Sequence, residues 1–126
     1  MKTFLYTTML ILLSTLIGCS GSDAYRGNWK AMDKNGNKWD ILFDAKSFTV
    51  KNSEGISEKY EYTQNSVKIE NAIKSYGIKL KDGRVFTISF PLANNTSKGI
   101  ISLETKEPLY TIGRNEYVEY ADLFKL

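Results

Sequence analysis

The residue types that most often carry enzyme chemistry are scarce in this sequence. It has no histidine and a single cysteine, at position 19. Catalysis by Ser/His or Cys/His pairs needs an imidazole base, and zinc or copper sites usually rely on His or Cys ligands. The composition therefore argues against these classes of enzyme and metal site. A lone cysteine also leaves no disulfide within the chain, so stability must come from packing.

Carboxylates are the remaining candidates for acid–base chemistry. Glu58 and Glu61 are close in sequence, as are Glu116 and Glu119, and paired carboxylates catalyse glycoside hydrolysis. In a β-strand, however, residues an odd number apart project from opposite faces, so neither pair converges on one substrate. We interpret these acids as part of a solvated outer face, and we predict no catalytic residue and no enzyme activity.

A second polar pattern matches a calcium loop only in part. Asp33, Asn35, Asn37 and Asp44 occupy offsets 1, 3, 5 and 12, but the sixth position, where such a loop needs Gly, is Lys38. An Asn-Gly turn between two alternating segments is instead typical of a β-hairpin. We therefore predict no metal site and no cofactor.

The first 18 residues have the layout of a secretory signal. Lys2 carries one positive charge, and residues 4–17 are almost entirely apolar or hydroxyl-bearing, in a stretch too short for a comfortable membrane span. The stretch ends in Leu16-Ile17-Gly18-Cys19, which resembles the lipobox of bacterial lipoproteins. The resemblance implies cleavage before Cys19, a diacylglycerol thioether on its sulfur, and usually a further acyl chain, such as palmitate, on the new amino group.

Such an anchor places the mature protein at a membrane surface, because each buried methylene contributes about 0.8 kcal/mol. Ser20 stands where an aspartate would suggest inner-membrane retention in some bacteria, so we expect the outer membrane. Basic residues are spread along the chain, whose net charge is only +3, and do not indicate a nucleic-acid partner. We interpret residues 1–18 as a signal peptide, 19–24 as an acylated, flexible tether and 25–126 as one β-domain.

The residues beyond the expected signal favour an all-β domain. They hold 14 of the 16 aromatic residues, and turn signals recur between short alternating segments. Consecutive hairpins predict an antiparallel meander of about 8–10 short strands, which forms a small barrel or, alternatively, a β-sandwich. The expected strands are roughly 25–33, 37–44, 47–51, 58–64, 67–72, 74–81, 84–91, 98–104, 109–113 and 116–120. The segment Tyr117–Leu126 is compatible with either a strand or a short helix.

The turns fix the register of these hairpins. A three-residue loop at 34–36, with its glycine in the left-handed position, pairs Trp29 with Ile41 and keeps the apolar residues on one face. The same arrangement is expected at 81–83. A two-residue turn is expected at 65–66, because the apolar alternation changes phase there.

The first expected strand carries one further family resemblance. Gly27-Asn28-Trp29 is similar to the start of lipocalin-like barrels, in which the tryptophan fills the closed end. The resemblance implies a shortened barrel that encloses an apolar ligand or, as in bacterial lipoprotein members, lipids or other partners. It also implies that Arg114, near the end of the chain, packs over Trp29.

The aromatic content suggests binding, because tyrosine offers apolar area with a polar tip. We predict a membrane-anchored, non-catalytic protein that binds a small apolar or amphipathic ligand. The alternative is a protein–protein interaction component of an envelope complex for secretion or nutrient uptake, or a toxin-neutralising inhibitor. A cavity favours the first, and a flat exposed aromatic patch of several hundred Å² favours the second. The candidate ligand-binding residues are Trp29, Trp39, Tyr60, Tyr62, Tyr76 and Tyr117.

Overall fold

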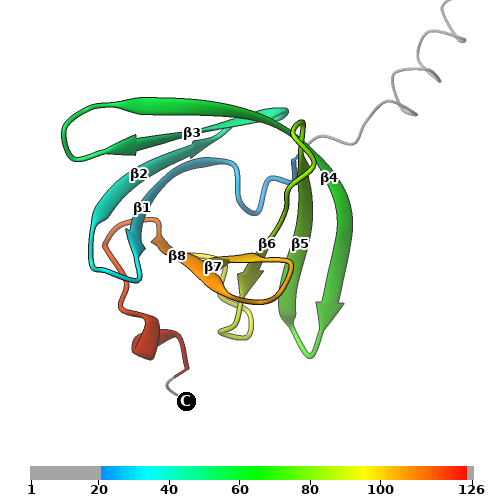
Figure 1. The fold of residues 1–126 in the computed structure, drawn as a ribbon. Coiled ribbons are helices and arrows are strands. Elements are labelled where there is room, and N and C mark those ends of the chain that lie inside the picture. The colour runs from blue at the N-terminus through cyan, green and yellow to red at the C-terminus, as the bar shows by residue number, and fades with distance from the viewer. Residues whose placement is uncertain (1–20, 125–126) are drawn as a thin grey trace, which may run out of the picture.

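The computed structural model describes residues 21–124; the expected signal peptide, the lipobox and Cys19 lie outside the described residues. Eight antiparallel strands follow one another in chain order and form a closed barrel, because β8 also pairs with β1 (Figure 1). The all-β meander and the small lipocalin-like barrel are therefore confirmed, and the sandwich alternative is not observed. The elements are β1 (Gly27–Asp33), β2 (Lys38–Phe43), β3 (Ser47–Asn52), β4 (Ser57–Glu70), β5 (Ile73–Leu80), β6 (Val85–Phe90), β7 (Lys98–Leu103), β8 (Pro108–Gly113) and a 3-10 helix, η1 (Tyr120–Phe124).

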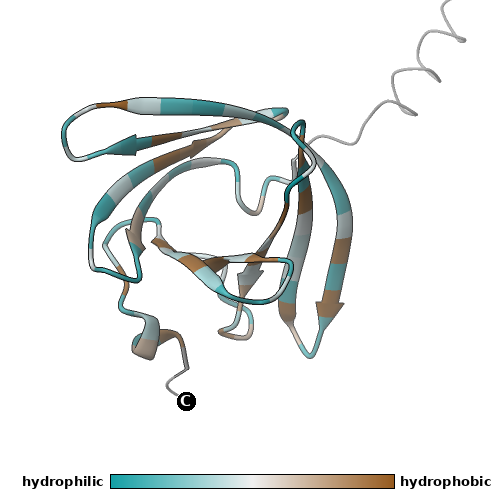
Figure 2. Ribbon diagram, in the orientation of Figure 1, coloured by the Kyte–Doolittle hydropathy of each residue, from teal (hydrophilic) through white to brown (hydrophobic). Residues whose placement is uncertain are grey.

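Alternation of apolar and polar residues decides which face of each strand lines the barrel. Figure 2 shows hydrophobic and hydrophilic segments following one another along the strands. In β6, for example, Phe86, Ile88 and Phe90 are buried while the residues between them are half-buried. Side chains alternate across a strand, so these three face the interior together with their cross-strand partners. Each large apolar side chain that is fully buried in this way contributes about 1.5–3 kcal/mol.

The two three-residue loops have the predicted register. Trp29 pairs with Ile41 across the first hairpin. Gly36 and Gly83, at the corresponding place in each loop, have φ of +81° and +98°, a backbone region that glycine enters without steric cost. The alternation in the sequence thus suffices to align these strands.

The predicted turn at Asn65-Ser66 is wrong. β4 continues through it, with a β-bulge against β5 between Gln64 and Ser66. The chain turns instead at Asn71-Ala72, where φ is +54° and +64°, as in the type I′ turns that favour hairpins. A one-residue bulge and a two-residue turn both shift the phase of the alternation, so the apolar pattern does not distinguish them.

The C-terminal segment does not form the expected strand at 116–120. It leaves the barrel after β8 and ends in η1, which lies outside the ring of strands (Figure 1). Val118 and Leu123 pack there against Ile100, in a cluster separate from the barrel core. In the part of the chain that the structure describes, no helix is long and apolar enough to cross a membrane.

Candidate functional site

One end of the barrel is closed around Trp29. Its indole nitrogen donates a hydrogen bond to the carbonyl of Tyr25 at 2.8 Å, and its side chain is 1% exposed. The guanidinium of Arg114 lies 3.7 Å from the centre of the Trp29 ring and donates to the carbonyls of Asn28 and Ala24. The predicted contact between Arg114 and Trp29 is therefore confirmed.

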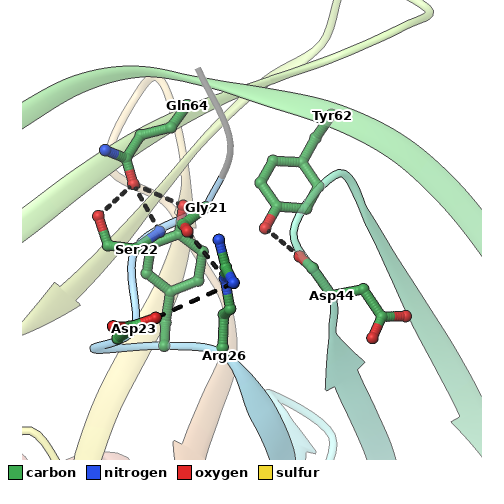
Figure 3. Close-up of polar contacts among 8 residues, drawn as sticks. Gly21, Ser22, Asp23, Arg26, Asp44, Tyr62 and Gln64 are labelled. Carbon is green, nitrogen blue, oxygen red and sulfur yellow. Dashed lines mark hydrogen bonds and ion pairs between the residues drawn. The ribbon is translucent and has the colours of Figure 1, made fainter. Parts of the chain in front are cut away.

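The segment that enters this closed end is bound to the barrel. The side-chain oxygen of Gln64 on β4 accepts hydrogen bonds from the backbone and hydroxyl of Ser22 and from the hydroxyl of Tyr25, at 2.7–3.1 Å (Figure 3). The amide of Gly21 donates to the carbonyl of Ala45 at 2.7 Å. The described part of the expected tether, residues 21–24, thus joins the fold, because its polar groups find partners on the strand ends.

Three of the candidate ligand-binding residues belong to this closed core. Trp29, Tyr62 and Tyr76 are at most 5% exposed. The hydroxyl of Tyr62 donates to the carbonyl of Asp44 at 2.6 Å (Figure 3), and burial raises the pKa of both Tyr62 and Tyr76. Their packing against neighbouring rings fills the space that a ligand would need.

Tyr117 lies on the outside of the barrel. The ammonium groups of Lys30 and Lys38 are 5.2 and 4.9 Å from the centre of its ring. Both lysines occupy outward-facing positions, since each is next to a residue that faces the interior, Trp29 or Trp39. Tyr117 is therefore separated from the interior residues with which the prediction grouped it.

The opposite end of the barrel opens into a cavity of about 290 Å³. We call it the mouth. Two of the six candidate residues, Trp39 and Tyr60, line it. Its walls are mainly apolar and aromatic, and its polar groups lie toward the rim. The lining residues are Trp39, Phe48, Val50, Asn52, Ile56, Glu58, Tyr60, Arg84, Phe86, Leu109 and Tyr110.

The aromatic rings of the mouth hold one another in place. Trp39 meets Tyr110 edge-on at 6.0 Å between ring centres, and Phe48 lies 5.3 Å from Tyr60. Phe48, Phe86 and Tyr110 were missed as candidates. All three face the interior, and Phe86 and Tyr110 lie near the mouth end of their strands, so combining the register with the strand direction would have found these two.

Charged side chains also face the mouth. Asp33 pairs with Tyr110 and Glu58 pairs with Val50, and residues paired directly across two strands share a face. Glu58 is solvent-exposed as predicted, but its predicted place on the outer face is wrong, because the register directs it inward. Its neighbour Glu61 does face outward, where it forms an ion pair with Lys81 at 3.2 Å.

Asp33 is fixed by hydrogen bonds. One oxygen accepts from the backbone amides of Asn35 and Asn37, both at 2.9 Å, and the other accepts from the indole nitrogen of Trp39 at 3.1 Å. Desolvation by itself raises the pKa of Asp33, but the hydrogen bonds from Trp39, Asn37 and Asn35 outweigh it and hold that pKa below its ordinary value. The carboxylate is thus kept ionised beside Trp39.

The other carboxylate of the mouth is bound by a tyrosine. The hydroxyl of Tyr60 donates to Glu58, and this hydrogen bond, together with desolvation, raises the pKa of Tyr60. Desolvation raises the pKa of Tyr110, and the charges of Asp33 and Glu58 add to the effect. Both phenols therefore remain neutral near these two carboxylates.

The one cation in the lining of the mouth is already paired. Nε of Arg84 donates a hydrogen bond to a carboxylate oxygen of Asp82 at 2.9 Å, and an Nη forms an ion pair with the same oxygen at 2.8 Å. The guanidinium lies 5.3 Å from the centre of Tyr60 and 5.6 Å from that of Phe86. Arg84 thus stacks on the aromatic wall while Asp82 neutralises its charge.

This arrangement is suited to holding a small molecule. A cavity near 300 Å³ with apolar walls and a few fixed polar groups is typical of small-ligand sites. Within residues 21–124, no three side chains among His, Cys, Asp and Glu form a group that could hold a metal ion. No protein-family model, curated protein or solved structure matches this chain.

Proposed function

We propose that this protein is a membrane-anchored, non-catalytic lipoprotein that binds a small amphipathic ligand in the mouth of its barrel. The observation that carries the proposal is the cavity itself, about 290 Å³ lined by aromatic side chains, at the open end of an otherwise filled barrel. Its place at one end of a rigid closed sheet favours a preformed site, which costs little ordering entropy on binding.

The proposed anchor agrees with the direction of the mouth. β1 begins at Gly27, next to the segment 21–26 that covers the closed end, and it ends at Asp33 beside the mouth. An acyl chain on Cys19 would therefore hold the closed end toward the membrane surface. The mouth would face away from the bilayer, so we propose that the ligand arrives from the aqueous side.

The non-catalytic part of the proposal rests on how the acids of the mouth are used. Asp33 accepts four hydrogen bonds, three from its own hairpin and one from Trp39, and Glu58 accepts one from Tyr60. A general acid or base needs a pKa tuned toward neutrality, and the hydrogen bonds to Asp33 lower its pKa instead. We therefore assign both carboxylates to ligand recognition.

The two tryptophans allow a direct test. Trp39 lies in the mouth and Trp29 in the closed core, so their indole N–H signals in a proton–nitrogen correlation spectrum report on the two ends separately. We expect a neutral amphipathic probe, dimethyl benzyl carbinol, to shift the Trp39 signal saturably and to leave the Trp29 signal in place. Equal movement of both signals, or none, would count against a site in the mouth.

The second candidate, an interaction component of an envelope complex, is favoured by the β4–β5 hairpin. Val67 and Ile69 near its tip are 52% and 63% exposed, and exposed apolar side chains on neighbouring positions are a common feature of protein interfaces. A V67S/I69S variant tests this role. It should keep the Trp39 response while losing a stoichiometric partner that the wild-type protein retains through purification from its own membranes.

A further inference from the structure

The aromatic wall of the mouth already carries a positive charge. The guanidinium of Arg84 lies over the rings of Tyr60 and Phe86 at 5.3 and 5.6 Å, within the distance at which a cation is attracted to a ring face. The rings of Trp39 and Tyr110 line the same cavity. Tryptophan binds cations most strongly of the three aromatic side chains, and here its N–H donates to a carboxylate, which adds electron density to the ring.

The charges that face the cavity are mainly negative. Glu58 lines the cavity from β4, and Asp33 lies beside it on β1, where it accepts a hydrogen bond from the indole of Trp39. Arg84 contributes the one cation of the lining, and Asp82 neutralises it through a hydrogen bond and an ion pair to one oxygen.

Among the described residues, no lysine lines the cavity. Lys38 and Lys59 occupy outward-facing positions, because each neighbours a residue that lines the cavity. Lys34 forms an ion pair with Glu107 at 3.5 Å. The mouth therefore combines aromatic faces with an excess of negative charge.

We infer that the ligand of the mouth is a small organic cation, of the size and chemistry of an aryl or alkyl quaternary ammonium ion. This inference rests on the proposed function and names the ligand class for the same site. A cation of this kind brings apolar methyl groups to the rings and a delocalised positive charge to Asp33 and Glu58. Because it is weakly hydrated, it loses little on entering a largely apolar cavity. An anion would instead meet the carboxylate of Glu58, with that of Asp33 nearby, and an arginine that is already paired.

Three probes of one shape separate charge from apolar contact. They are benzyltrimethylammonium, the neutral dimethyl benzyl carbinol, and the anion α,α-dimethyl-β-phenylpropanoate. Each is titrated into the full chain in non-ionic detergent micelles, and the indole signals of Trp39 and Trp29 are followed. We expect the cation to bind about tenfold more tightly than the neutral probe, since a partly desolvated cation–π contact and two nearby carboxylates favour it. We expect the anion to bind most weakly.

A matched pair of variants tests the role of the charge. Glu58→Gln removes an inward carboxylate but keeps an acceptor for the Tyr60 hydroxyl, whereas Glu61→Gln makes the same change on the outer face. We expect Glu58→Gln to weaken binding of the cation by about threefold to tenfold and to weaken binding of the neutral probe by less. Glu61→Gln should change neither, and added salt should weaken only the cation.

The outcomes separate the two proposals. If the neutral probe or the anion binds as tightly as the cation, the mouth remains a ligand site but the inference of a cationic ligand is overturned. Equal effects of Glu58→Gln and Glu61→Gln would overturn it too. If no probe moves the Trp39 signal, the proposed function itself fails, and the inference fails with it.

Discussion

The cover over the closed end of the barrel depends on Arg114. Its guanidinium lies 3.7 Å from the centre of the Trp29 ring, and two of its nitrogens donate to the carbonyls of Asn28 and Ala24 at 3.1 and 3.2 Å. These contacts join the segment after β8 to the start of β1, at the strand pair that closes the barrel. Arg114→Met removes the charge and both donors but keeps a long apolar side chain.

The cost of Arg114→Met follows from three contacts. A buried hydrogen bond from a charged donor is worth about 1.5–3 kcal/mol, but one of these bonds is exposed and the other is only partly buried. We therefore assign each bond about 0.5–1 kcal/mol, by discounting the buried value for solvent screening. A cation over an indole at a half-exposed site adds about 0.5–1 kcal/mol. The expected loss in the free energy of unfolding is about 2 kcal/mol, or roughly a thirtyfold change in the folding equilibrium.

Urea denaturation followed by tryptophan fluorescence measures this loss. The midpoint should fall while the slope with urea stays the same, because the mutation changes stability and not the surface exposed on unfolding. Lys79→Met is the matched control on the outer face of β5, and we expect it to change stability by less than about 0.5 kcal/mol. Arg114→Lys should lose about half as much as Arg114→Met, since it keeps the charge but not the planar stack. If Arg114→Met is as stable as the Lys79 control, the closed end does not depend on this contact.

Other positions give further expectations. Ala72→Gly should stabilise the protein by about 0.5–1 kcal/mol in urea denaturation, because alanine at φ of +64° carries a strain that glycine avoids. A loss of stability in this variant would contradict the turn geometry. Asp33→Asn should cost about 1 kcal/mol at neutral pH, because the amide cannot accept from both its own hairpin and the indole of Trp39. Because folding lowers the pKa of Asp33, its contribution to the free energy of unfolding is present above pH 3.8 and is lost as the pH falls through the lower pKa of the folded state. The difference in stability between Asp33→Asn and wild type should therefore shrink in acid. A difference that does not depend on pH would refute this. Burial raises the pKa of Tyr62 above 10.0, so the stability that the neutral phenol contributes is present below pH 10.0 and is lost as the pH rises. Unfolding in base should therefore coincide with a late phase of tyrosine ionisation, measured by ultraviolet absorbance. This phase should be smaller in Tyr62→Phe.

The sequence was sufficient to predict the pairing of two strands where only one kind of turn could keep their apolar residues on the same face. Trp29 and Ile41 had to share a face, and the loop with Gly36 was the way to achieve this, so their pairing was predictable. The phase change near Asn65 had two solutions, a turn or a bulge. The structure adopts the bulge, and Asn71-Ala72 forms the turn although it lacks a glycine.

Only two of the six candidate residues line the mouth, for a related reason. Except for Tyr117, the candidate aromatic residues do face inward. Whether such a residue lies at the closed or the open end, however, depends on how the chain covers the barrel. Tyr62 and Tyr76 lie under the segment 21–26, which is held by Gln64, and no local pattern announces that side-chain contact. Glu58 was misassigned because alternating acids and tyrosines are also typical of solvated strands, and only its partner on β3 shows that it faces inward.

The central claim is that the mouth holds a small molecule. Native mass spectrometry of the protein purified from its own membranes tests it most directly, with Glu58→Trp to fill the cavity and Glu61→Trp as the same change on the outer face. We predict a non-covalent adduct on the wild-type protein and on Glu61→Trp that is absent from Glu58→Trp. An adduct of equal occupancy on all three proteins, or none on the wild type, would contradict it.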